Sequence, residues 1–416
     1  MANCPAAVPR RRTLLVGAAA LACPGVPLFA QPAADTGANM AALVVVIEAG
    51  ADRVALVDGA RLALLHRFPT RPGLLAAPSF WPGGRFVLLA SADGWLSKFD
   101  LVQRRLVAEV RAGSRLAGVA ISSDGRWVMA ANTEPPSAPL FDADLNPVKT
   151  FAATTRDGRR SSAVDGVHDA PARRSFIVAL RDIAELWEIS YNPRAEDFYE
   201  GLVHDFRMGE GVPTRGFHNA RRTFLPAPLT GLYIDPPAIH ALGNSAGAEG
   251  AASSHAVNLD VRRRVASLVV AGHPQLAGAV AFEAGGRALL AVPNASRAVV
   301  SVFDRADWRL LHELPTAGPG LRLAAHPLSP FICVATAGVA ADASALTIID
   351  QRSLQAVATV REPGQLLAHA EFSADGRQLL VCTAQDDGAL IAYDAGDFAA
   401  RARLPMRRPV GAWRAP

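Results

Sequence analysis

Histidine has the widest chemical capacity of the residue types in this sequence, and four of the ten histidines stand out. His273 and His326 each precede a proline, His369 lies close to Phe372, and His168 lies near another apolar run. A neutral imidazole can ligate a metal or exchange a proton near pH 7. Each ring can equally cap a turn or lie at the edge of a core, and the residues alone leave both interpretations open. No G-x-S-x-G, H-E-x-x-H or phosphate-loop motif is present, so none of these enzyme classes is indicated.

The cationic side chains are almost all arginine, because lysine occurs only at Lys98 and Lys149. An arginine-rich genome is the simple explanation. The functional explanation is that guanidinium groups bind carboxylates and phosphates in a forked geometry. The formal net charge is +4, and no basic run carries interleaved aromatic residues. Nucleic acid is therefore not an expected partner.

The four cysteines do not form a recognisable cofactor motif. Cys4 and Cys23 lie near the N-terminus, and Cys333 and Cys382 lie in apolar, strand-like runs. Neither of the latter has C-x-x-C or C-x-x-C-H spacing, so covalent haem c and a zinc ribbon are not indicated. In an oxidising compartment they could pair, but two buried thiols are the favoured interpretation.

Residues 1–30 have the organisation of an export signal. Arg10, Arg11 and Arg12 precede Thr13-Leu14-Leu15 and an apolar stretch, and Ala30 offers a small-residue cleavage site. An arginine pair before Thr-Leu-Leu is similar to a twin-arginine signal, which exports folded proteins. We therefore expect a periplasmic protein, with lipidation at Cys23 left open. No later apolar run reaches the ~18–20 residues of a membrane span.

One pattern recurs along the remainder of the chain. A Gly-Arg turn, as in 82–85, 123–126, 284–287 and 374–377, leads to an apolar run, a polar hairpin and a second apolar run that ends in aspartate. These aspartates are Asp58, Asp100, Asp142, Asp260, Asp304, Asp350 and Asp394. Asp58 and Asp100 are 42 residues apart, and Asp304 and Asp350 are 46 apart. Repeats of about 40–50 residues with four short strands are typical of β-propellers.

The repeat predicts an all-β protein, a β-propeller with eight blades or possibly seven. Ser175–Tyr191 supplies a further unit, with Ile189-Ser190-Tyr191 in place of the aspartate. We expect residues 41–416 to form one propeller domain with an irregular insertion at about 192–255. A closed ring also predicts that the first strands, near Val44–Val57, complete a blade or pack beside the last one.

Several segments resemble a known family. They include Ala92–Leu101, Ser122–Arg126, Asn132–Pro136, Val164–Gly166, Glu185–Trp187 and His369–Ser373. These segments are similar to the haem d1 domain of cytochrome cd1 nitrite reductase, and more closely to the exported NirF-type proteins of haem d1 biosynthesis. The resemblance extends from about Val44 to Trp413.

The resemblance implies that haem d1 or a related tetrapyrrole lies on one axial face of the propeller. Two His-Pro histidines lie over this face in the reductase, and His273 and His326 are similar to them. The cofactor-binding residues implied here are His273, His326, His369, His168 and Arg160, the last of these together with Arg115 and Arg71 facing the tetrapyrrole carboxylates. If this is correct, His273, His326 and His369 converge on one axial face.

The chain departs from the family at the proximal iron ligand. The family carries a histidine in the loop before the second Gly-Arg turn, whereas the corresponding loop here, Arg71–Ser79, contains none. Leu75, Ala76 and Ala77 occupy the position, and none can ligate iron. No metal-ligand set is therefore predicted, and nitrite reduction is disfavoured.

Two functions remain open from the sequence. The first is an exported haem d1-like propeller that binds a tetrapyrrole or related ligand in cofactor maturation or redox chemistry. Its partner would be an exported redox enzyme or a haem-maturation protein. The alternative is a propeller without haem that acts as a binding or assembly partner of another exported enzyme.

Overall fold

Short apolar runs bounded by turn residues form nearly all of the structure. The computed structural model describes residues 42–75, 77–199, 213–246 and 252–416, and the predicted export signal and Cys23 lie outside these ranges. The described residues form β-strands and a few single 3-10 turns, with no α-helix among them. These turns are η2 (Ala49–Ala51), η3 (Pro171–Arg173), η5 (Leu276–Gly278) and η6 (Ala341–Ala343).

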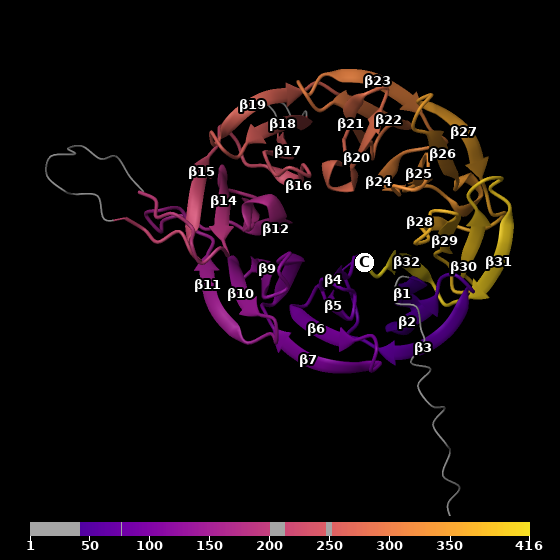
Figure 1. Ribbon diagram of the computed structural model, residues 1–416, viewed down its shortest axis with the longest axis horizontal. Coiled ribbons are helices and arrows are strands. Elements are labelled where there is room, and N and C mark those ends of the chain that lie inside the picture. The colour runs from indigo at the N-terminus through magenta and orange to yellow at the C-terminus, as the bar shows by residue number, and fades with distance from the viewer. Residues whose placement is uncertain (1–41, 76, 200–212, 247–251) are drawn as a thin grey trace, which may run out of the picture. The chain divides into compact units, whose positions relative to one another are not determined.

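The strands form eight antiparallel sheets of four strands, arranged as blades around an axis (Figure 1). Blades I to IV contain, from inner to outer strand, β32 (Pro409–Arg414), β1 (Leu43–Glu48), β2 (Arg53–Asp58), β3 (Ala63–Pro69); β4 (Ser79–Phe80), β5 (Phe86–Ala90), β6 (Trp95–Asp100), β7 (Arg105–Arg111); β8 (Arg115–Ile121), β9 (Trp127–Glu134), β10 (Ser137–Asp142), β11 (Pro147–Ala152); and β12 (Val164–Ala170), β13 (Ser175–Leu180), β14 (Glu185–Ser190), β15 (Ala220–Phe224).

Blades V to VIII contain, in the same order, β16 (Thr230–Ile234), β17 (His240–Ala246), β18 (Ala252–Asn258), β19 (Arg263–Leu268); β20 (Val280–Ala284), β21 (Arg287–Pro293), β22 (Val299–Asp304), β23 (Leu310–Pro315); β24 (Gly320–Ala325), β25 (Phe331–Thr336), β26 (Leu346–Asp350), β27 (Gln355–Val360); and β28 (Leu367–Phe372), β29 (Gln378–Thr383), β30 (Ala389–Asp394), β31 (Ala400–Pro405). The eight-bladed prediction is confirmed, and the seven-bladed alternative is wrong.

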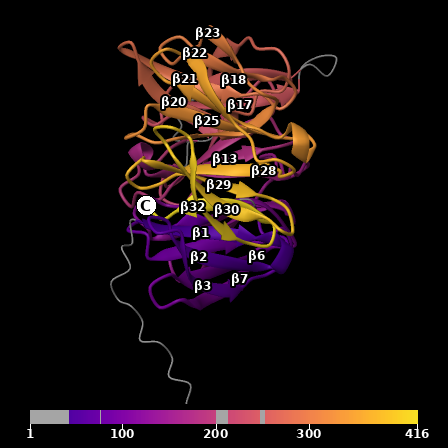
Figure 2. The ribbon, with the colours of Figure 1, turned by 90° about the vertical axis from the view of Figure 1, so that its right-hand side faces the viewer.

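Blade I closes the ring with strands from both ends of the chain. β1 pairs with β2 on one side and with β32 on the other, with Val45 opposite Trp413. Figures 1 and 2 both show β32 beside β1. The prediction that the first strands complete a blade with the last one is therefore confirmed.

Apolar side chains pack between neighbouring blades, and this explains why the strands carry apolar residues at consecutive positions. Alternate residues of a strand point to opposite faces of its sheet. In β1, Val44 and Val46 belong to the core shared with blade VIII, whereas Val45 and Ile47 belong to the core shared with blade II. Each sheet therefore buries both faces, and only the outer strands are mostly exposed. Cys333 and Cys382 are free and buried within such cores.

Most of the repeated aspartates hold turns, as expected of turn residues. Asp100 accepts hydrogen bonds from the backbone N–H groups of Val102 and Gln103. In blade V this role belongs to Asn258, which accepts from Asp260 and Val261. Asp260 instead pairs with Arg173. The aspartate pattern therefore placed this blade's turn residue two positions too late.

The range 192–255 contains more regular structure than an irregular insertion would. It includes β15, β16, β17 and the first residues of β18. The irregular part among the described residues lies between β14 and β15, and it includes an isolated bridge between Phe198 and Thr214. Polar residues in these strands, and prolines in the loops between them, concealed their period from the sequence analysis.

Candidate functional site

The two ends of the ring differ in the loops that they carry. The interblade face is the end at which the inner strands begin. Hydrogen bonds between its loops connect neighbouring blades, as from Ala92 N–H to the Gly73 carbonyl and from Leu116 N–H to the Ala92 carbonyl. The turn face is the opposite end, at which the inner strands of blades II to VIII turn into the second strand of their blade. The Gly-Arg turns lie on the turn face.

His273 and His326 lie at opposite ends of the ring. The backbone N–H of His273 donates to Asn294 Oδ1, and the Asn294 carbonyl accepts from Gly320, the first residue of β24. His326 directly follows Ala325, the last residue of β24. A six-residue strand spans about 20 Å. The predicted convergence of the two His-Pro histidines is therefore wrong, because they flank the inner strand on different sides.

His326 is a buried part of the turn face. Its Nδ1 faces the backbone N–H of Leu328 at 3.2 Å, and its Nε2 faces Arg414 Nη1 at 2.9 Å. Burial lowers the pKa of this histidine, and the positive charge of Arg414 lowers it further. Because Arg414 ends the closing strand β32, the ring of His326 connects blade VII to the closure of the propeller. This geometry is that of a structural residue.

His369 lies within the inner strand of blade VIII. Its ring packs against Trp413 with 4.8 Å between the ring centroids, and its Nε2 is buried without a hydrogen-bond partner. Burial lowers its pKa to about 4, the charge of Arg322 lowers it further, and a hydrogen bond with the backbone of Ala412 opposes the shift. The ring is therefore neutral at pH 7, and its Nε2 carries an unused lone pair or proton.

Arg322 and Glu371 accompany His369, and the sequence analysis did not single them out. Arg322 is exposed although it belongs to the inner strand β24. Burial raises the pKa of Glu371, whereas Arg414 and Arg322 act to lower it. An arginine in the middle of an otherwise apolar inner strand was the available sequence signal for this cluster.

His168 and Asp165 occupy the inner strand of blade IV, four blades from His369 along the ring. Protein atoms surround the His168 ring and lower its pKa to about 4, although Asp165 acts to raise it. Part of the residue remains accessible to solvent, as is possible for an inner strand. Asp165 accepts a hydrogen bond from Gly231 N–H at 2.8 Å and contacts Arg181, so it joins blades IV and V.

Arg160 lies on the interblade face, in the loop that leads into blade IV. Thr155 and Asp157 hold this loop through a hydroxyl-to-carboxylate hydrogen bond, and Asp157 also accepts from Arg159 N–H. Arg160 is exposed and lines a cavity of about 580 Å³ together with Arg159. His273 is also exposed on this face, but over blade VI.

The Arg71–Ser79 loop, in which the resemblance implies a proximal histidine, contains no iron ligand. Arg71 in this loop pairs with Glu109 at 2.7 Å and stacks over Trp95 at 4.1 Å. Its guanidinium group is therefore already paired with a carboxylate of the protein. Leu75 N–H donates to the Ala90 carbonyl, and Ala76 lies outside the described residues. No group of three or more possible metal ligands occurs in the described part of the chain.

Comparison with known proteins decides the family. The model of the cytochrome D1 heme domain matches residues 38–415. The chain belongs to the cytochrome d1 haem domain family. A curated member, dihydro-heme d1 dehydrogenase of Pseudomonas aeruginosa, is 36% identical over 371 residues, which cover 89% of this chain and 70% of that protein. Protein NirF of Stutzerimonas stutzeri is 27% identical, and the match covers 92% of each chain.

A solved structure of the same family has the same fold. Dihydro-heme d1 dehydrogenase NirN in complex with DHE superposes with a TM-score of 0.82 at 35% identity, over 94% of this chain and 78% of that chain. Among the described residues, no helix is long and apolar enough to cross a membrane. Of the residues described above, His369, Arg322 and His168 lie on inner strands of this haem d1 domain. Arg160 and His273 lie on the interblade face, whereas His326 lies on the turn face.

Proposed function

We propose that this propeller binds a haem d1-type tetrapyrrole at the interblade end of its inner strands and acts in the maturation of that cofactor. The observation that carries the proposal is the pair formed by His369 and Arg322, within a member of a haem-binding family. A buried nitrogen without a partner is costly in a protein interior. A histidine nitrogen of this kind is also the atom that haem iron requires.

The residues present fit a tetrapyrrole held from one side. His369 is neutral at pH 7 and would offer Nε2 after its ring turns away from Trp413. Arg322 and Arg115 are exposed on inner strands and would face the carboxylates, since guanidinium groups bind carboxylates with paired hydrogen bonds. The Arg71–Ser79 loop adds no second ligand. This arrangement favours a protein that holds and presents the tetrapyrrole over one that reduces nitrite.

A dehydrogenation in the maturation pathway would remove two electrons and two protons from the tetrapyrrole, and the protons would pass to water. The tetrapyrrole itself supplies the carbon–carbon bond that is oxidised. This chain contains no C-x-x-C-H motif for haem c, so we propose a separate redox protein as the electron acceptor. An exported enzyme or a haem-maturation protein of the same compartment fits this role.

The test is a visible absorption titration of the purified protein with haem d1 and, as an accessible stand-in, with protohaem. We expect saturable binding with a shifted Soret band, and we expect His369→Leu to abolish the shift. Arg322→Ala should weaken binding about tenfold, which corresponds to one lost charge-assisted pair. His273→Leu is the matched control, because His273 lies on the same face but over blade VI.

An unchanged spectrum with correctly folded protein would overturn the proposal and favour the alternative of a haem-free assembly partner. Equal loss of binding in His273→Leu and His369→Leu would overturn the assignment of the ligand to His369.

We also propose that the protein is exported to the periplasm by a twin-arginine signal. The arginines before Thr13-Leu14-Leu15 support this proposal. Changing Arg11 and Arg12 to lysine should leave precursor in the cytoplasm, as fractionation would show. Normal export of this variant would contradict the twin-arginine route.

A further inference from the structure

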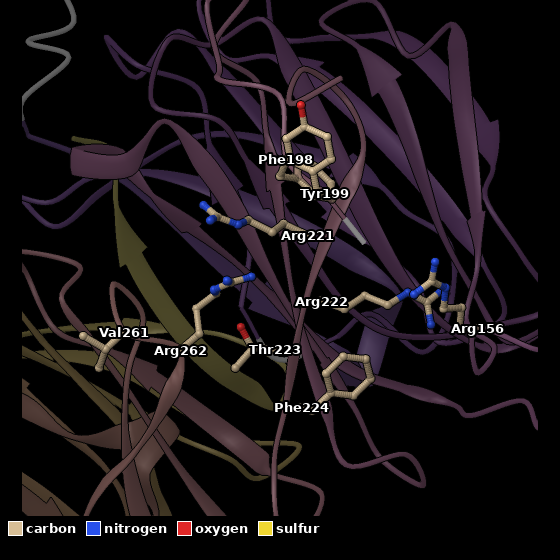
Figure 3. Close-up of a pocket in the computed structure, with 9 residues that line it drawn as sticks. All are labelled: Arg156, Phe198, Tyr199, Arg221, Arg222, Thr223, Phe224, Val261 and Arg262. Carbon is tan, nitrogen blue, oxygen red and sulfur yellow. The ribbon is translucent and has the colours of Figure 1, made fainter. Parts of the chain in front are cut away.

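The outer edge of the ring carries a second concentration of arginine, far from the axial residues in the fold. We call it the rim pocket. It lies against β15, the outer strand of blade IV, and is closed by Val261–Arg262 of blade V and by Phe198–Tyr199 (Figure 3). Its volume is about 310 Å³, within the range of about 300–1,000 Å³ that ligand pockets occupy.

The acids near the rim pocket are already committed to other arginines. Glu188 lies opposite Arg221 across the β14–β15 ladder, but its two carboxylate oxygens accept from Arg173 at 2.9 and 3.1 Å. Arg173 also pairs with Asp260. These contacts leave Arg221 without its cross-strand partner.

Glu185 is committed in the same way. Its Oε2 accepts from Trp187 Nε1 at 2.8 Å and from Arg222 Nη1 at 3.2 Å. Arg222 also stacks over Trp187 at 4.8 Å. The floor of the rim pocket is therefore neutralised, whereas its opening is not.

Arg221 and Arg262 have no ion-pair partner among the described residues. Burial lowers the pKa of Arg262, and the positive charge of Arg221 lowers it further, whereas the nearby carboxylate of Glu188 acts to raise it. Glu188 is hydrogen-bonded to Arg173 and forms no ion pair with either group, so the two guanidinium groups repel, and an anion placed between them reduces this repulsion. Figure 3 shows the two groups extending into the same space from different blades.

Flat apolar surfaces border these charges. Phe224 is 67% exposed and Tyr199 is 63% exposed, so both rings are accessible to a ligand. Arg221 also lies 6.0 Å from the ring of Phe198. The rim pocket therefore combines two unpaired cations with exposed aromatic rings.

We infer that the rim pocket binds a planar organic anion with two or more carboxylates. Arg221 and Arg262 come from different blades, so each would pair with one carboxylate, and the exposed rings would contact the flat body. Inorganic phosphate would leave the rings unused. Small aromatic polycarboxylates and the carboxylate-bearing edge of a tetrapyrrole share this chemistry. The inference is independent of the axial site, since none of its residues touches His369 or Arg322.

The test is isothermal titration with two probes, benzene-1,3,5-tricarboxylate and the metal-free dicarboxylate mesoporphyrin. We expect the wild-type protein to bind at least one probe, and the double variant Arg221→Ala, Arg262→Ala to bind it at least about thirtyfold more weakly, as two lost charged contacts predict. Arg287→Ala is the matched control, an exposed arginine at the start of β21 in another blade.

The outcomes separate the sources and the sites. Loss of tricarboxylate binding in the double variant supports a small-molecule site, and loss of mesoporphyrin binding supports a tetrapyrrole edge. Equal binding of citrate, which is not planar, would overturn the role of the rings. No binding of either probe, or tricarboxylate binding that the double variant retains, would overturn the inference. Mesoporphyrin can also occupy the proposed axial site, so its titrations are made in an Arg322→Ala, Arg115→Ala background. His369→Leu should leave tricarboxylate binding unchanged, so the two proposals fail separately.

Discussion

The two ends of the propeller show how one residue type takes different roles. On the turn face, the ring of His326 lies between two donors, Leu328 N–H and Arg414 Nη1, and its single acceptor nitrogen receives a hydrogen bond from one of them. Within the inner strand β28, burial also lowers the pKa of His369, but its Nε2 has no hydrogen-bond partner. The difference indicates that satisfied polar groups belong to the framework of the ring, whereas an unsatisfied one marks a place where stability has been given up.

The closing strand β32 shows the same contrast along its own length. Near its start, Glu48 accepts from Arg53, Arg67 and the backbone N–H of Arg407. At its end, the side chain of Arg414 has one hydrogen-bond partner among the described residues, the ring of His326. We therefore expect ring closure and ligand binding to depend on different residues.

The largest effect should come from opening the ring. Deleting residues 41–58 removes β1 and β2, and every residue of β1 is at most 4% exposed. Burial of one large apolar side chain contributes about 1.5–3 kcal/mol, so the sum exceeds the ~5–15 kcal/mol stability of a typical domain. We expect loss of the cooperative thermal transition in circular dichroism. A chain that starts at residue 31 is the control, and a cooperative transition in the deletion variant would contradict closure by β1.

Glu48→Gln should weaken closure by about 2–4 kcal/mol. Burial acts to raise the pKa of Glu48, but hydrogen bonds from Arg53 and Arg67 outweigh it and lower the pKa overall. Removing one charge of a buried pair costs about 3–5 kcal/mol, and the arginines here keep 32% and 30% of their side chains exposed, which reduces the effect. Urea denaturation measures it. Glu109→Gln, whose partner Arg71 is 40% exposed, is the control and should cost about 0–1 kcal/mol.

Mild acid should destabilise the protein through its buried histidines. The pKa values of His168, His218 and His369 are each lowered to about 4 from 6.5, with burial as the main cause. The unfolded chain therefore binds these protons first, so the free energy of unfolding falls between pH 6.5 and 4 and is unaffected above 6.5. Each ring should contribute on the order of 1–3 kcal/mol. Urea midpoints measured at several pH values should be flatter for His369→Leu, and an identical pH dependence would contradict the assignment.

The smallest stability effects should separate the two ends most clearly. His326→Ala removes the contacts with Leu328 and Arg414 and should cost about 1–2 kcal/mol, without changing tetrapyrrole binding. His369→Leu removes an unsatisfied buried nitrogen but also the hydrogen bond with the Ala412 backbone. These effects oppose one another, so the free energy of unfolding should change by no more than about 1 kcal/mol, while ligand binding is lost. Urea unfolding and absorption titration of both variants check this. A large destabilisation by His369→Leu would show that its Nε2 is satisfied in solution.

Several features of the fold were predictable because they depend on local sequence. The Gly-Arg turns, the apolar runs and turn aspartates such as Asp100 and Asp304 predicted a propeller with eight repeats. Blade V was harder, because Asn258 replaces the aspartate and the aspartate at 260 offered a false match two residues later. The strands within residues 192–255 were also harder to predict. The outer strand β15 carries mostly polar side chains, and the inner strand β16 contains Gly231.

The sequence by itself determined the repeat, the buried strands and the absence of a histidine in the Arg71–Ser79 loop, because these follow from short-range pattern and composition. Only the tertiary structure decided that His273 and His326 face opposite ends of the ring. It also decided that Arg322 lies beside His369, and that Glu188 is used by Arg173 instead of Arg221. The physical reason is that a single strand length separates the two faces. A shift of a few residues along the chain therefore moves a side chain from one end of the ring to the other, and the ion pairs depend on which strands the closure brings together.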